Sequence, residues 1–431
     1  MSEQKRVLII SYNALSKEGA NGRTMEFLVH SYAKENLAQL FFSGEKPDFE
    51  VCSRFYRVTE GQLLKAFLTG KSVGGRVSEA PTKSEASAQG SSGGGIFNFA
   101  KKNKRSNLVK FLRNSLWGLT KKKWYTTALK AWISEFSPEV ILTVSGKNSC
   151  FHNIALDIAR EFSLPLAVYH CEDYCFKNNM PRSPLYRRYI HGLKKSVDKL
   201  MDYASLAIYN SDTIEKIYSE HYKTPSTVVY MATDVSPTPK RQMSPAPVCS
   251  YMGNLTLGRD KSLFEVAKAL YEINPAAKVN LYAPAISDEF SEMLGSLPNI
   301  KYKGFISYDE CRKVISESDV LLHAESFEKK TAEDLRIAFS TKIADSLASG
   351  VPFFVYAPKG IAATDYLLAN NAACVATSAE DLSEKLRSFM TDTALRESYI
   401  ANALSLVQKN HTFEKTVQQI EEKLNSIGKD F

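Results

Sequence analysis

The sequence predicts an α/β protein built from two consecutive, doubly wound domains with mainly parallel sheets. The chain has 431 residues, about three times the usual size of one domain. Short apolar runs rich in Val, Ile and Leu alternate with helical patterns, which is typical of parallel strands buried on both faces. A proline-rich segment, residues 234–247, interrupts this alternation, which then starts again.

The expected strands form two groups, one on each side of the proline-rich segment. The first group comprises residues 6–11, 37–42, 139–145, 165–170 and 206–211. The second group comprises residues 248–253, 278–283, 300–305, 320–325, 352–357 and 373–377. We therefore expect a first domain over residues 1–235 and a second over 236–410, followed by a C-terminal helix, 411–431, that crosses back to the first domain. A Gly- and Ser-rich stretch at about 73–107 is expected to be a flexible insertion in the first domain.

The composition is that of a soluble globular enzyme, with 44% apolar and 24% charged residues. Seven scattered cysteines, an odd number, favour free thiols in a reducing compartment over a disulfide framework. Cys171 and Cys175 beside His170 do not have the spacing of a zinc site, so we expect no metal. No apolar stretch reaches the ~18 residues that a membrane span needs.

Ligands bind doubly wound sheets at the carboxyl ends of the strands, so we expect the site in the turns that follow the strands. Gly19 and Gly22 precede a helix after the opening strand, where a close backbone approach and free N–H groups suit an anion. This turn lacks the G-x-G-x-x-G pattern, and an ordinary strand–helix turn remains the alternative. After the strand at 248–253, Arg259 and Lys261 stand at the start of a helix. They oppose the helix dipole there, which makes sense if they hold an anion; a solvated charged turn is the alternative.

A third turn follows the strand at 320–325, which delivers Glu325 to the carboxyl edge. Ser340 or Thr341 is a good N-cap for the next helix, whose free N–H groups would form a second anion site. One turn further on, Asp345 would repel a phosphate but suits a neutral diol such as a ribose. Basic residues for a diphosphate, one acid for a ribose and a second acid at the sheet edge together describe a site for a nucleotide-diphosphate sugar.

Two segments resemble retaining GT-B glycosyltransferases of family 4, in particular those of bacterial surface (capsular, exo- or O-antigen) polysaccharides. FSTKIADSLASGVPFFVYAP, residues 339–358, resembles their donor-binding segment, and YMGNLTLGRDKSL, residues 251–263, resembles their diphosphate-binding turn. Residues 36–60 resemble the first domain of that group. The resemblance implies two Rossmann-like domains facing across a cleft, transfer with retention, and UDP- or GDP-sugar as the substrate without a tightly bound cofactor.

The resemblance also implies a role for each matching residue. Asp345 would be the ribose-binding acid and Glu325 the acid near the sugar. His170 would act at the transferred sugar, with Glu172 and Asp173 as alternatives. The implied donor-binding residues are Gly22, Arg23, Gly253, Asn254, Arg259, Lys261, Arg336, Ser340, Thr341, Lys342 and Asp345.

The chain departs from the family pattern in the loop before Asp345. Glu325 and Glu333 happen to fit the family's Glu-x7-Glu spacing. We assign the second acid to Asp345, because the LASG that follows it matches the family. Glu333 is then a coincidence, the loop is longer, and Asp replaces Glu, which leaves the donor geometry open.

The net charge of +8 is concentrated in one stretch. Ten basic residues and no acidic ones lie between Lys101 and Lys130, and the rest of the chain carries −2. A second basic stretch spans residues 186–201. Basic and apolar residues together suit an anionic membrane or a lipid-linked acceptor, on the cytoplasmic face of the inner membrane. A core-facing helix with a solvated basic side is the alternative. The expected acceptor or membrane residues are Arg113, Trp117, Lys122, Arg187 and Arg188.

Other functions were weighed against a transferase acting on a lipid-linked or oligosaccharide acceptor. Nucleic-acid binding is not expected, because the sequence has no recognition-helix or RNP-type motif. A nucleotide-sugar epimerase on the same scaffold would turn over its substrate without an acceptor. A non-catalytic nucleotide-binding partner of another transferase would tolerate the loss of Glu325.

Overall fold

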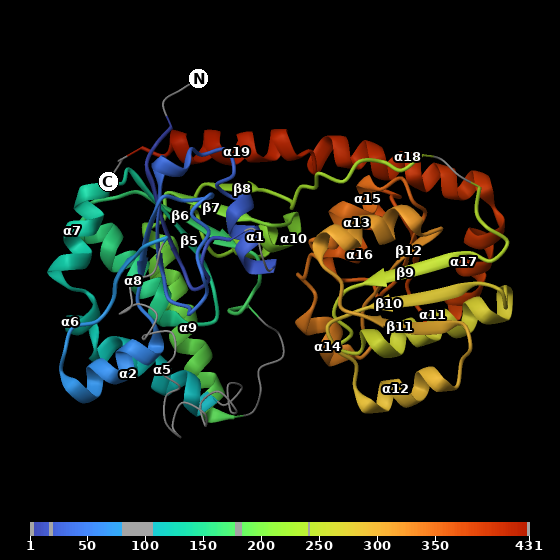
Figure 1. The fold of residues 1–431 in the computed structure, drawn as a ribbon, viewed down its shortest axis with the longest axis horizontal. Helices are drawn as coiled ribbons and strands as arrows, with labels where there is room; N and C mark the ends of the chain where they lie inside the picture. Colours follow the sequence, from blue (N-terminus) through green and yellow to red (C-terminus); the bar gives the residue numbers. More distant parts are fainter. Residues whose placement is uncertain (1–3, 17–19, 80–106, 177–182, 240–241, 429–431) are drawn as a thin grey trace. The chain divides into compact units, whose positions relative to one another are not determined.

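The computed structural model describes residues 4–16, 20–79, 107–176, 183–239 and 242–428. The chain forms two compact units, Met1–Val229 with Glu414–Phe431, and Tyr230–Phe413 (Figure 1). It therefore passes from one unit to the other twice. Among the described helices, none is both long and apolar enough to cross a membrane.

The first unit contains an eight-stranded sheet with the order β4-β3-β2-β1-β5-β6-β7-β8. Its strands are β1 (Val7–Ser11), β2 (Leu37–Phe41), β3 (Arg54–Arg57), β4 (Gly75–Val77), β5 (Val140–Val144), β6 (Leu166–His170), β7 (Leu206–Tyr209) and β8 (Ser226–Val228). Neighbouring strands are parallel, except that β4 runs antiparallel to β3. β4 lies within the stretch expected to be a flexible insertion; residues 80–106 of that stretch are outside the described residues.

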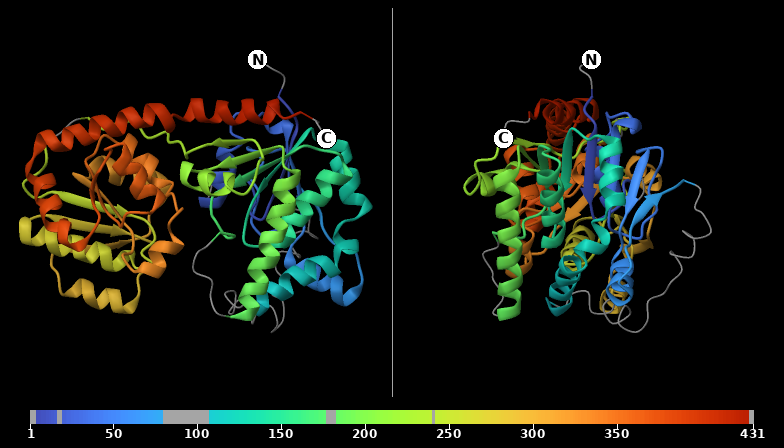
Figure 2. Two further views of the ribbon diagram at one scale, coloured as in Figure 1. Left: turned by 180° about the vertical axis from the view of Figure 1, so that it is seen from behind. Right: turned by 90° about the vertical axis from the view of Figure 1, so that its left-hand side faces the viewer.

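Nine described helices belong to this unit. They are α1 (Ala20–Phe27), α2 (Glu60–Thr69), α5 (Asn107–Leu119), α6 (Lys121–Trp124), α7 (Thr127–Phe136), α8 (Ser149–Glu161), α9 (Pro184–Tyr203), α10 (Asp212–Ser219) and the C-terminal α19 (Phe413–Ser426). The amide of Gln419 on α19 donates hydrogen bonds to Thr227 Oγ1 (3.0 Å) and Val228 O (3.2 Å) of β8. The C-terminal helix therefore packs on the first unit (Figure 2).

The second unit contains a parallel six-stranded sheet with the order β11-β10-β9-β12-β13-β14. Its strands are β9 (Val248–Met252), β10 (Lys278–Tyr282), β11 (Ile300–Gly304), β12 (Val320–Ala324), β13 (Phe353–Tyr356) and β14 (Cys374–Ala376). Its helices are α11 (Arg259–Ile273), α12 (Asp288–Gly295), α13 (Tyr308–Glu317), α14 (Lys329–Asp334), α15 (Lys342–Ala348), α16 (Ala362–Ala369), α17 (Ala379–Thr391) and α18 (Thr393–Asn410). α13, α15 and α16 lie on one side of the strands, and α11 and α12 on the other (Figure 1). All strands expected for this half are present, with ends that differ by one residue at most on either side.

Both sheets change the direction of their strand order at one place, between β1 and β5 in the first unit and between β9 and β12 in the second. The connections on the two sides of such a point lead to opposite faces of the sheet. This leaves a crevice beyond the carboxyl ends of the two strands, where doubly wound folds bind ligands. The loops after β1, β5, β9 and β12 are therefore the first places to look for a site.

Candidate active site

A buried ion pair between Arg259 and Glu325 lies at the point where the second sheet changes direction. Arg259 is the first residue of α11, which follows β9, and Glu325 directly follows β12. Arg259 Nε donates to Glu325 Oε2 at 2.7 Å, and its Nη2 donates to Oε1 at 3.0 Å. The side chain of Glu325 is 3% exposed and that of Arg259 is 16% exposed. Two parallel hydrogen bonds between ionised groups make this one of the stronger kinds of polar contact.

The electrostatics keep both partners charged. Burial by itself would raise the pKa of Glu325, but His323 and Arg259 together bring it below its ordinary value. His323 Nε2 lies 3.3 Å from Glu325 Oε1. Burial likewise opposes the charge of Arg259, and Glu325 nevertheless raises the pKa of the guanidinium. The two groups therefore stabilise each other as ions at neutral pH.

A glycine allows the helix that carries Arg259 to start this close to β12. Gly258 has a positive φ of 77°, and a Cβ at this position would lie 2.6 Å from Ser326 Oγ. The hydroxyl of Ser262, on the first turn of α11, donates to the carbonyl oxygen of Glu325 at 2.8 Å. The backbone conformation and the close approach both require glycine here, so the start of α11 and the end of β12 form one unit.

The other donor-site residues predicted in this turn are more exposed. A Cβ on Gly253 would lie 2.7 Å from the hydroxyl of Tyr251, which donates to the carbonyl oxygen of Asn254 at 2.8 Å. The side chain of Asn254 accepts a hydrogen bond from Thr256 N at 2.9 Å. Lys261 is exposed on the first turn of α11 and pairs with no acid among the described residues. Its charge is thus available to a ligand at this edge.

Asp345 belongs to a second cluster at the carboxyl edge of the same sheet. It lies on α15, and its Oδ1 accepts hydrogen bonds from Thr233 Oγ1 at 2.6 Å and from the hydroxyl of Tyr308 at 3.5 Å. Tyr308 is the first residue of α13, the helix after β11. The predicted ribose-binding acid is therefore held by two hydroxyl groups from separate segments.

The start of α15 contains the remaining donor-site residues predicted from the sequence. Ser340 Oγ accepts from Lys342 N at 3.4 Å, while the side chains of Thr341 and Lys342 are exposed. Arg336 is half-buried, and its carbonyl oxygen accepts from Ala362 N at 2.7 Å, which ties the loop after β12 to α16. These residues line the same edge as Asp345, and their roles toward a ligand stay predictions.

The structure places His170 in the core of the first unit. Its side chain is fully buried beneath the rings of Tyr209 and Tyr218, and Nε2 lies 3.2 Å from Met201 Sδ. Burial, helped by the nearby His152, lowers the pKa of His170 to about 3. A neutral imidazole in this position packs the core under the carboxyl edge.

The two acids named as alternatives to His170 lie just beyond β6. Asp173 is buried, and its Oδ1 accepts from Cys175 N at 2.8 Å and Phe176 N at 2.9 Å, which caps the turn. Glu172 is exposed and lies 3.8 Å from Lys147. Of the three candidates, Glu172 is the one whose side chain solvent reaches.

An arginine also occupies the point where the first sheet changes direction. The guanidinium of Arg113, on α5, lies 5.0 Å from the ring of Tyr12, which follows β1, and 5.9 Å from that of Phe151, on the helix after β5. Its Nε donates to Glu60, the first residue of α2. Burial opposes the charge of Arg113, but Glu60 and Tyr12 raise its pKa. This unit thus presents a cation among aromatic rings at its own ligand-binding edge.

The loop after β1 is held close to its helix. Gly22 is buried in α1, where a Cβ would lie 2.8 Å from the carbonyl oxygen of Ser16. A larger residue would therefore push this loop away from the helix. The side chain of Arg23, the other donor-site residue predicted here, is outside the described part of the structure.

The basic stretch differs from the expected membrane arm. Trp117 is 1% exposed and packs against Phe42, Phe151 and Trp124, so its indole cannot reach a membrane surface. Lys121 pairs with Asp157 of α8 at 2.5 Å, and Lys130 pairs with Glu161 of the same helix at 2.6 Å. These acids offset part of the positive charge of the basic stretch. A charge count along the sequence does not show that acids on α8 pair with these lysines. It also does not show that an apolar residue of the stretch, such as Trp117, faces inward. Lys122, Arg187 and Arg188 are exposed, as expected.

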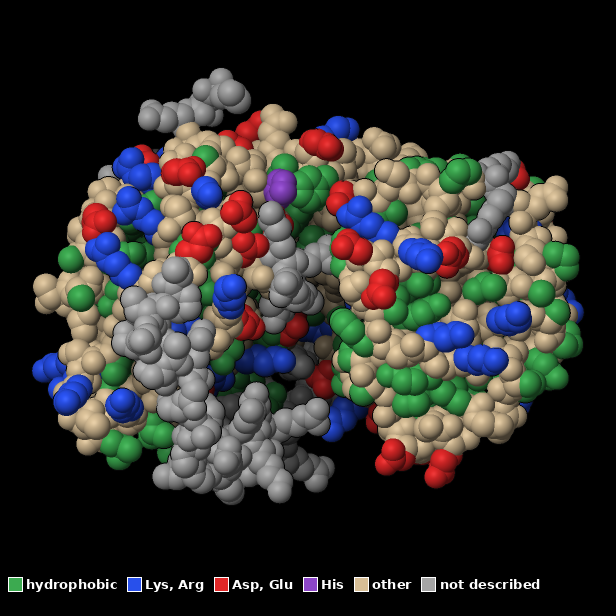
Figure 3. Space-filling model, in the orientation of Figure 1, with side chains coloured by type: hydrophobic (Ala, Val, Ile, Leu, Met, Phe, Trp, Pro, Cys, Tyr) green, Lys and Arg blue, Asp and Glu red, His purple; other side chains and the backbone are tan. Residues whose placement is uncertain are grey.

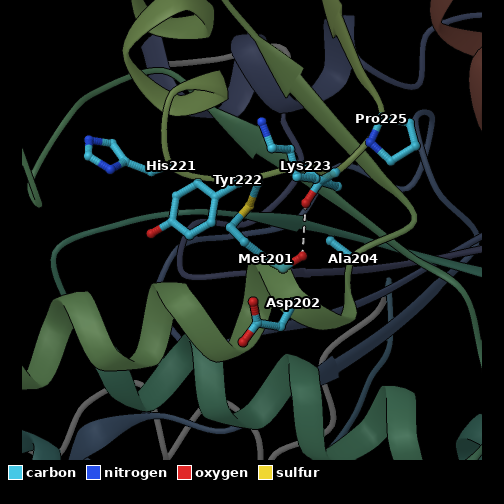
Figure 4. Close-up of a pocket in the computed structure, with 8 residues that line it drawn as sticks. Met201, Asp202, Ala204, His221, Tyr222, Lys223 and Pro225 are labelled. Carbon is cyan, nitrogen blue, oxygen red and sulfur yellow. Dashed lines mark hydrogen bonds between the residues drawn. The ribbon is translucent and has the colours of Figure 1, made fainter.

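Two hollows of the first unit are large enough for a small ligand. One of about 440 Å³ lies between the end of α9 and the segment before β8, so it opens at the end where β7 and β8 begin (Figure 4). It is therefore not at the carboxyl edge. The other, of about 380 Å³, is an open hollow lined by residues of α5, α8 and α9. Its lining residues are Asn114, Ser115, Ser149, Arg188, Tyr189, His191 and Gly192.

Within the described residues, no group of three His, Cys, Asp or Glu side chains could hold a metal ion.

Sequence reasoning missed the residues that hold the predicted ones. Thr233 lies just before the proline-rich segment and Tyr308 at a helix start, and no spacing relates them to Asp345. Glu60 and Tyr12 lie far from Arg113 along the chain. Tyr12 and Tyr308 follow expected strands, which is a usable signal, whereas Glu60 and Thr233 follow β3 and β8, which the sequence did not predict.

Comparison with known proteins identifies the fold. Residues 259–422 match the sequence model of a family described as glycosyl transferase-like. No curated protein sequence matches the chain. The fold is that of HepE from Anabaena, solved with UDP and glucose (TM-score 0.59, 14% identity, 98% of this chain and 100% of HepE). The fold is that of GT-B glycosyltransferases, and the second unit matches a glycosyl transferase-like family.

Two further GT-B structures cover nearly the whole chain. Sucrose-phosphate synthase from Thermosynechococcus elongatus matches with a TM-score of 0.59 and 12% identity, over 98% of both chains. WaaG, a glycosyltransferase involved in lipopolysaccharide biosynthesis, matches with a TM-score of 0.56 and 11% identity, over 97% of this chain and 100% of WaaG. At such identities the likeness establishes the fold; substrates have to be argued from the residues of this chain.

The buried pair predicts a stability effect. Glu325→Ala leaves the Arg259 guanidinium buried without its counter-charge, and we expect the free energy of unfolding to fall by about 3 kcal/mol. Urea unfolding followed by circular dichroism measures this. Glu317→Ala, which removes an exposed acid of the same sheet's α13, serves as the control and should cost roughly 0.5 kcal/mol or less. Equal effects of the two substitutions would contradict the assignment of a buried pair.

Proposed function

We propose that this glycosyltransferase takes a sugar from a nucleotide-diphosphate sugar bound at the carboxyl ends of β9 and β12 and transfers it to a glycan acceptor. The observation that carries the proposal is the position of Arg259, a partly buried cation at the start of α11 and at the point where the sheet order reverses. Such a point binds ligands in doubly wound sheets, and a helix start there favours an anion. Lys261 adds an exposed positive charge on the same helical turn.

Arg259 can hold a phosphate while it remains paired with Glu325. The pair uses Nε and Nη2, and a guanidinium has five N–H donors. Nη1 is therefore the natural donor for a diphosphate oxygen, and Glu325 fixes the plane of the guanidinium. In the transfer step, the bond between the sugar and the diphosphate breaks and negative charge grows on the leaving oxygen. Cations already oriented toward that oxygen stabilise this charge without reorganisation.

Three finer features of the function are part of the proposal. HepE has been solved with UDP and with UDP-glucose, which favours UDP over GDP as the nucleotide. Asp345, held by two hydroxyl groups, would accept hydrogen bonds from the ribose diol. Transfer with retention rests on the resemblance of residues 251–263 and 339–358 to family 4 enzymes.

For the acceptor we propose a lipid-linked glycan of a bacterial surface polysaccharide, bound by the first unit. Arg113 supports this, because a cation flanked by the rings of Tyr12 and Phe151 suits an acceptor with both an anionic group and apolar or sugar faces. The hollow next to it, lined by Asn114 and Arg188, offers further polar contacts. WaaG, which has the same fold, acts in lipopolysaccharide biosynthesis.

A membrane-facing surface on the first unit fits such an acceptor. Phe67 and Leu68 at the end of α2 are 56% and 75% exposed, and Leu119 at the end of α5 is 74% exposed. The loop after α2 is joined to α6 by a hydrogen bond from Val73 N to Lys123 O at 2.9 Å. Lysine side chains surround these apolar residues, and Figure 3 shows basic and apolar side chains together over α2 and α6. The exposed lysines are Lys65, Lys71, Lys121 and Lys122.

An epimerase or a non-catalytic nucleotide-binding partner would use the same donor site. An epimerase converts the nucleotide sugar at full rate without an acceptor, whereas a transferase shows only slow hydrolysis. A non-catalytic partner would keep its biological activity in Glu325→Ala. We favour the transferase, because Arg113 and the adjacent hollow provide the first unit with polar groups for a second substrate.

The donor site makes a kinetic prediction. Arg259→Ala is expected to lower kcat/KM for the nucleotide sugar about 100-fold, since one oriented donor to the leaving oxygen is lost. Transfer of radiolabelled sugar from UDP-glucose and related UDP-sugars to a membrane-lipid extract measures this. Lys268→Ala removes an exposed charge further along α11 and should leave kcat/KM unchanged. A loss of equal size in both variants, or none in either, would refute the role of Arg259.

The membrane surface makes a separate prediction. Phe67→Ser combined with Leu68→Ser should weaken binding to phosphatidylglycerol-containing vesicles at least ~10-fold in sedimentation assays, because two exposed apolar side chains that would enter the bilayer are lost. Phe305→Ser, which removes a 73% exposed ring from the second unit, is the matched control and should have no effect. Binding that is equally strong on neutral vesicles, or equally sensitive to Phe305→Ser, would argue against this surface.

A further inference from the structure

We propose that Thr233 is a positioning residue for the donor, which holds the Asp345 carboxylate in the orientation that receives the ribose. This inference rests on the proposed nucleotide-sugar site and adds to it a residue that directly precedes the proline-rich segment. Thr233 also precedes the second sheet and lies outside both donor-binding segments, 251–263 and 339–358. It acts through Asp345 and would not itself touch the reacting atoms.

The hydrogen bonds of Thr233 fix the direction of its hydroxyl proton. Its Oγ1 accepts from Val235 N at 3.1 Å, and a backbone N–H can only donate. The same Oγ1 lies 2.6 Å from Asp345 Oδ1, and an ionised carboxylate can only accept. The hydroxyl proton therefore points at Asp345. The hydrogen bond is charge-assisted and partly shielded from water, since Thr233 is 8% exposed and Asp345 is half-buried.

The backbone of Thr233 is itself tightly held. Its N–H donates to His411 O at 3.2 Å, and it forms a parallel bridge with Thr412. His411 is fully buried, with Nδ1 2.7 Å from Met231 O and Nε2 2.9 Å from the hydroxyl of Tyr366. The two segments where the chain enters and leaves the second unit are thus fastened together. Thr233 projects from this fixed point toward Asp345.

The aromatic residues around this point reach the start of α15 as well. Tyr230 packs against Phe339 and Tyr366, with ring centroids 5.1 and 4.7 Å apart. Phe339 immediately precedes Ser340, the expected anion-binding residue. Asp345 and Ser340, at two positions along the same donor element, are therefore both supported from the segment 230–233. A group held this way keeps its geometry without a ligand, which lowers the cost of ordering it on binding.

A purely structural role for Thr233 makes a different prediction from a positioning role. If Thr233 only stabilised the fold, its loss would lower stability and reduce kcat and donor affinity together. If it orients Asp345 toward the ribose, its loss weakens contacts that depend on the ribose hydroxyls. The comparison of UDP with 2′,3′-dideoxy-UDP isolates that dependence, because the two differ only in the diol.

The test uses Thr233→Val, which keeps the shape but removes the hydroxyl, and Thr233→Ser, which keeps the hydroxyl. We expect Thr233→Val to raise the KM for the UDP-sugar about 10-fold with kcat within about 2-fold, and Thr233→Ser to stay close to the wild type. In calorimetric titrations, the wild type and Thr233→Ser should prefer UDP over dideoxy-UDP, and Thr233→Val should lose most of that preference.

The possible results separate this inference from the proposed function. If the wild type binds no nucleoside diphosphate, the donor site itself is wrong. If the wild type and Thr233→Val prefer UDP equally while Asp345→Asn loses the preference, only the role of Thr233 is overturned. Should Thr233→Val fail to fold, Thr233→Ala takes its place in the same titrations, and a retained preference for UDP overturns the role in the same way.

Discussion

The ion pair between Arg259 and Glu325 is the interaction around which the proposed donor site is organised. Burying two charges costs several kcal/mol per ion, and a pair of apolar residues would often stabilise a core equally well. The pair is joined by a bidentate contact, a nearby imidazole and a glycine that brings α11 within reach of β12. Such a costly arrangement is understandable where an oriented guanidinium is needed at a ligand-binding edge.

The two units share an arginine–glutamate pair but differ in what surrounds it. Each has an arginine paired with a glutamate at the point where its sheet order reverses. In the second unit the pair lies beside His323, Ser262 and Gly258, the glycine that brings the start of α11 close to β12. In the first unit the arginine lies against Tyr12 and Phe151, which suits a larger ligand with apolar or sugar faces. The difference between the surroundings agrees with a division into donor and acceptor sites.

The fold could be predicted because buried parallel strands appear in the sequence as continuous apolar runs. β3, with two buried residues between two arginines, and the three-residue β8 carry no such signal and were missed. The turn with Arg259 and Lys261 could be found because cations at a helix start conflict with the helix dipole. The pairing of Arg259 with Glu325 could not be predicted, because the two residues follow different strands, β9 and β12, that are far apart in the sequence.

The errors in the basic stretch have the same cause. Trp117 stands in a run of lysines and arginines, and only the packing of α5 on Phe42 and Phe151 shows that it faces inward. His170 ends a strand at the expected edge, but whether such a side chain points to solvent or into the core depends on neighbouring strands and helices. Thr233 could not be singled out from the sequence, because it is held by the chain that returns beside it at Thr412. Contacts between distant segments are what a single sequence does not contain.

Thermal unfolding in the presence of UDP, GDP, ADP and NAD tests the central claim most directly, because a ligand that binds the native state raises its unfolding temperature. The account predicts that one nucleoside diphosphate, UDP in the first instance, raises the midpoint of the wild-type protein and that Arg259→Ala abolishes the shift. A shift with NAD alone, or a shift with UDP that survives Arg259→Ala unchanged, would contradict it.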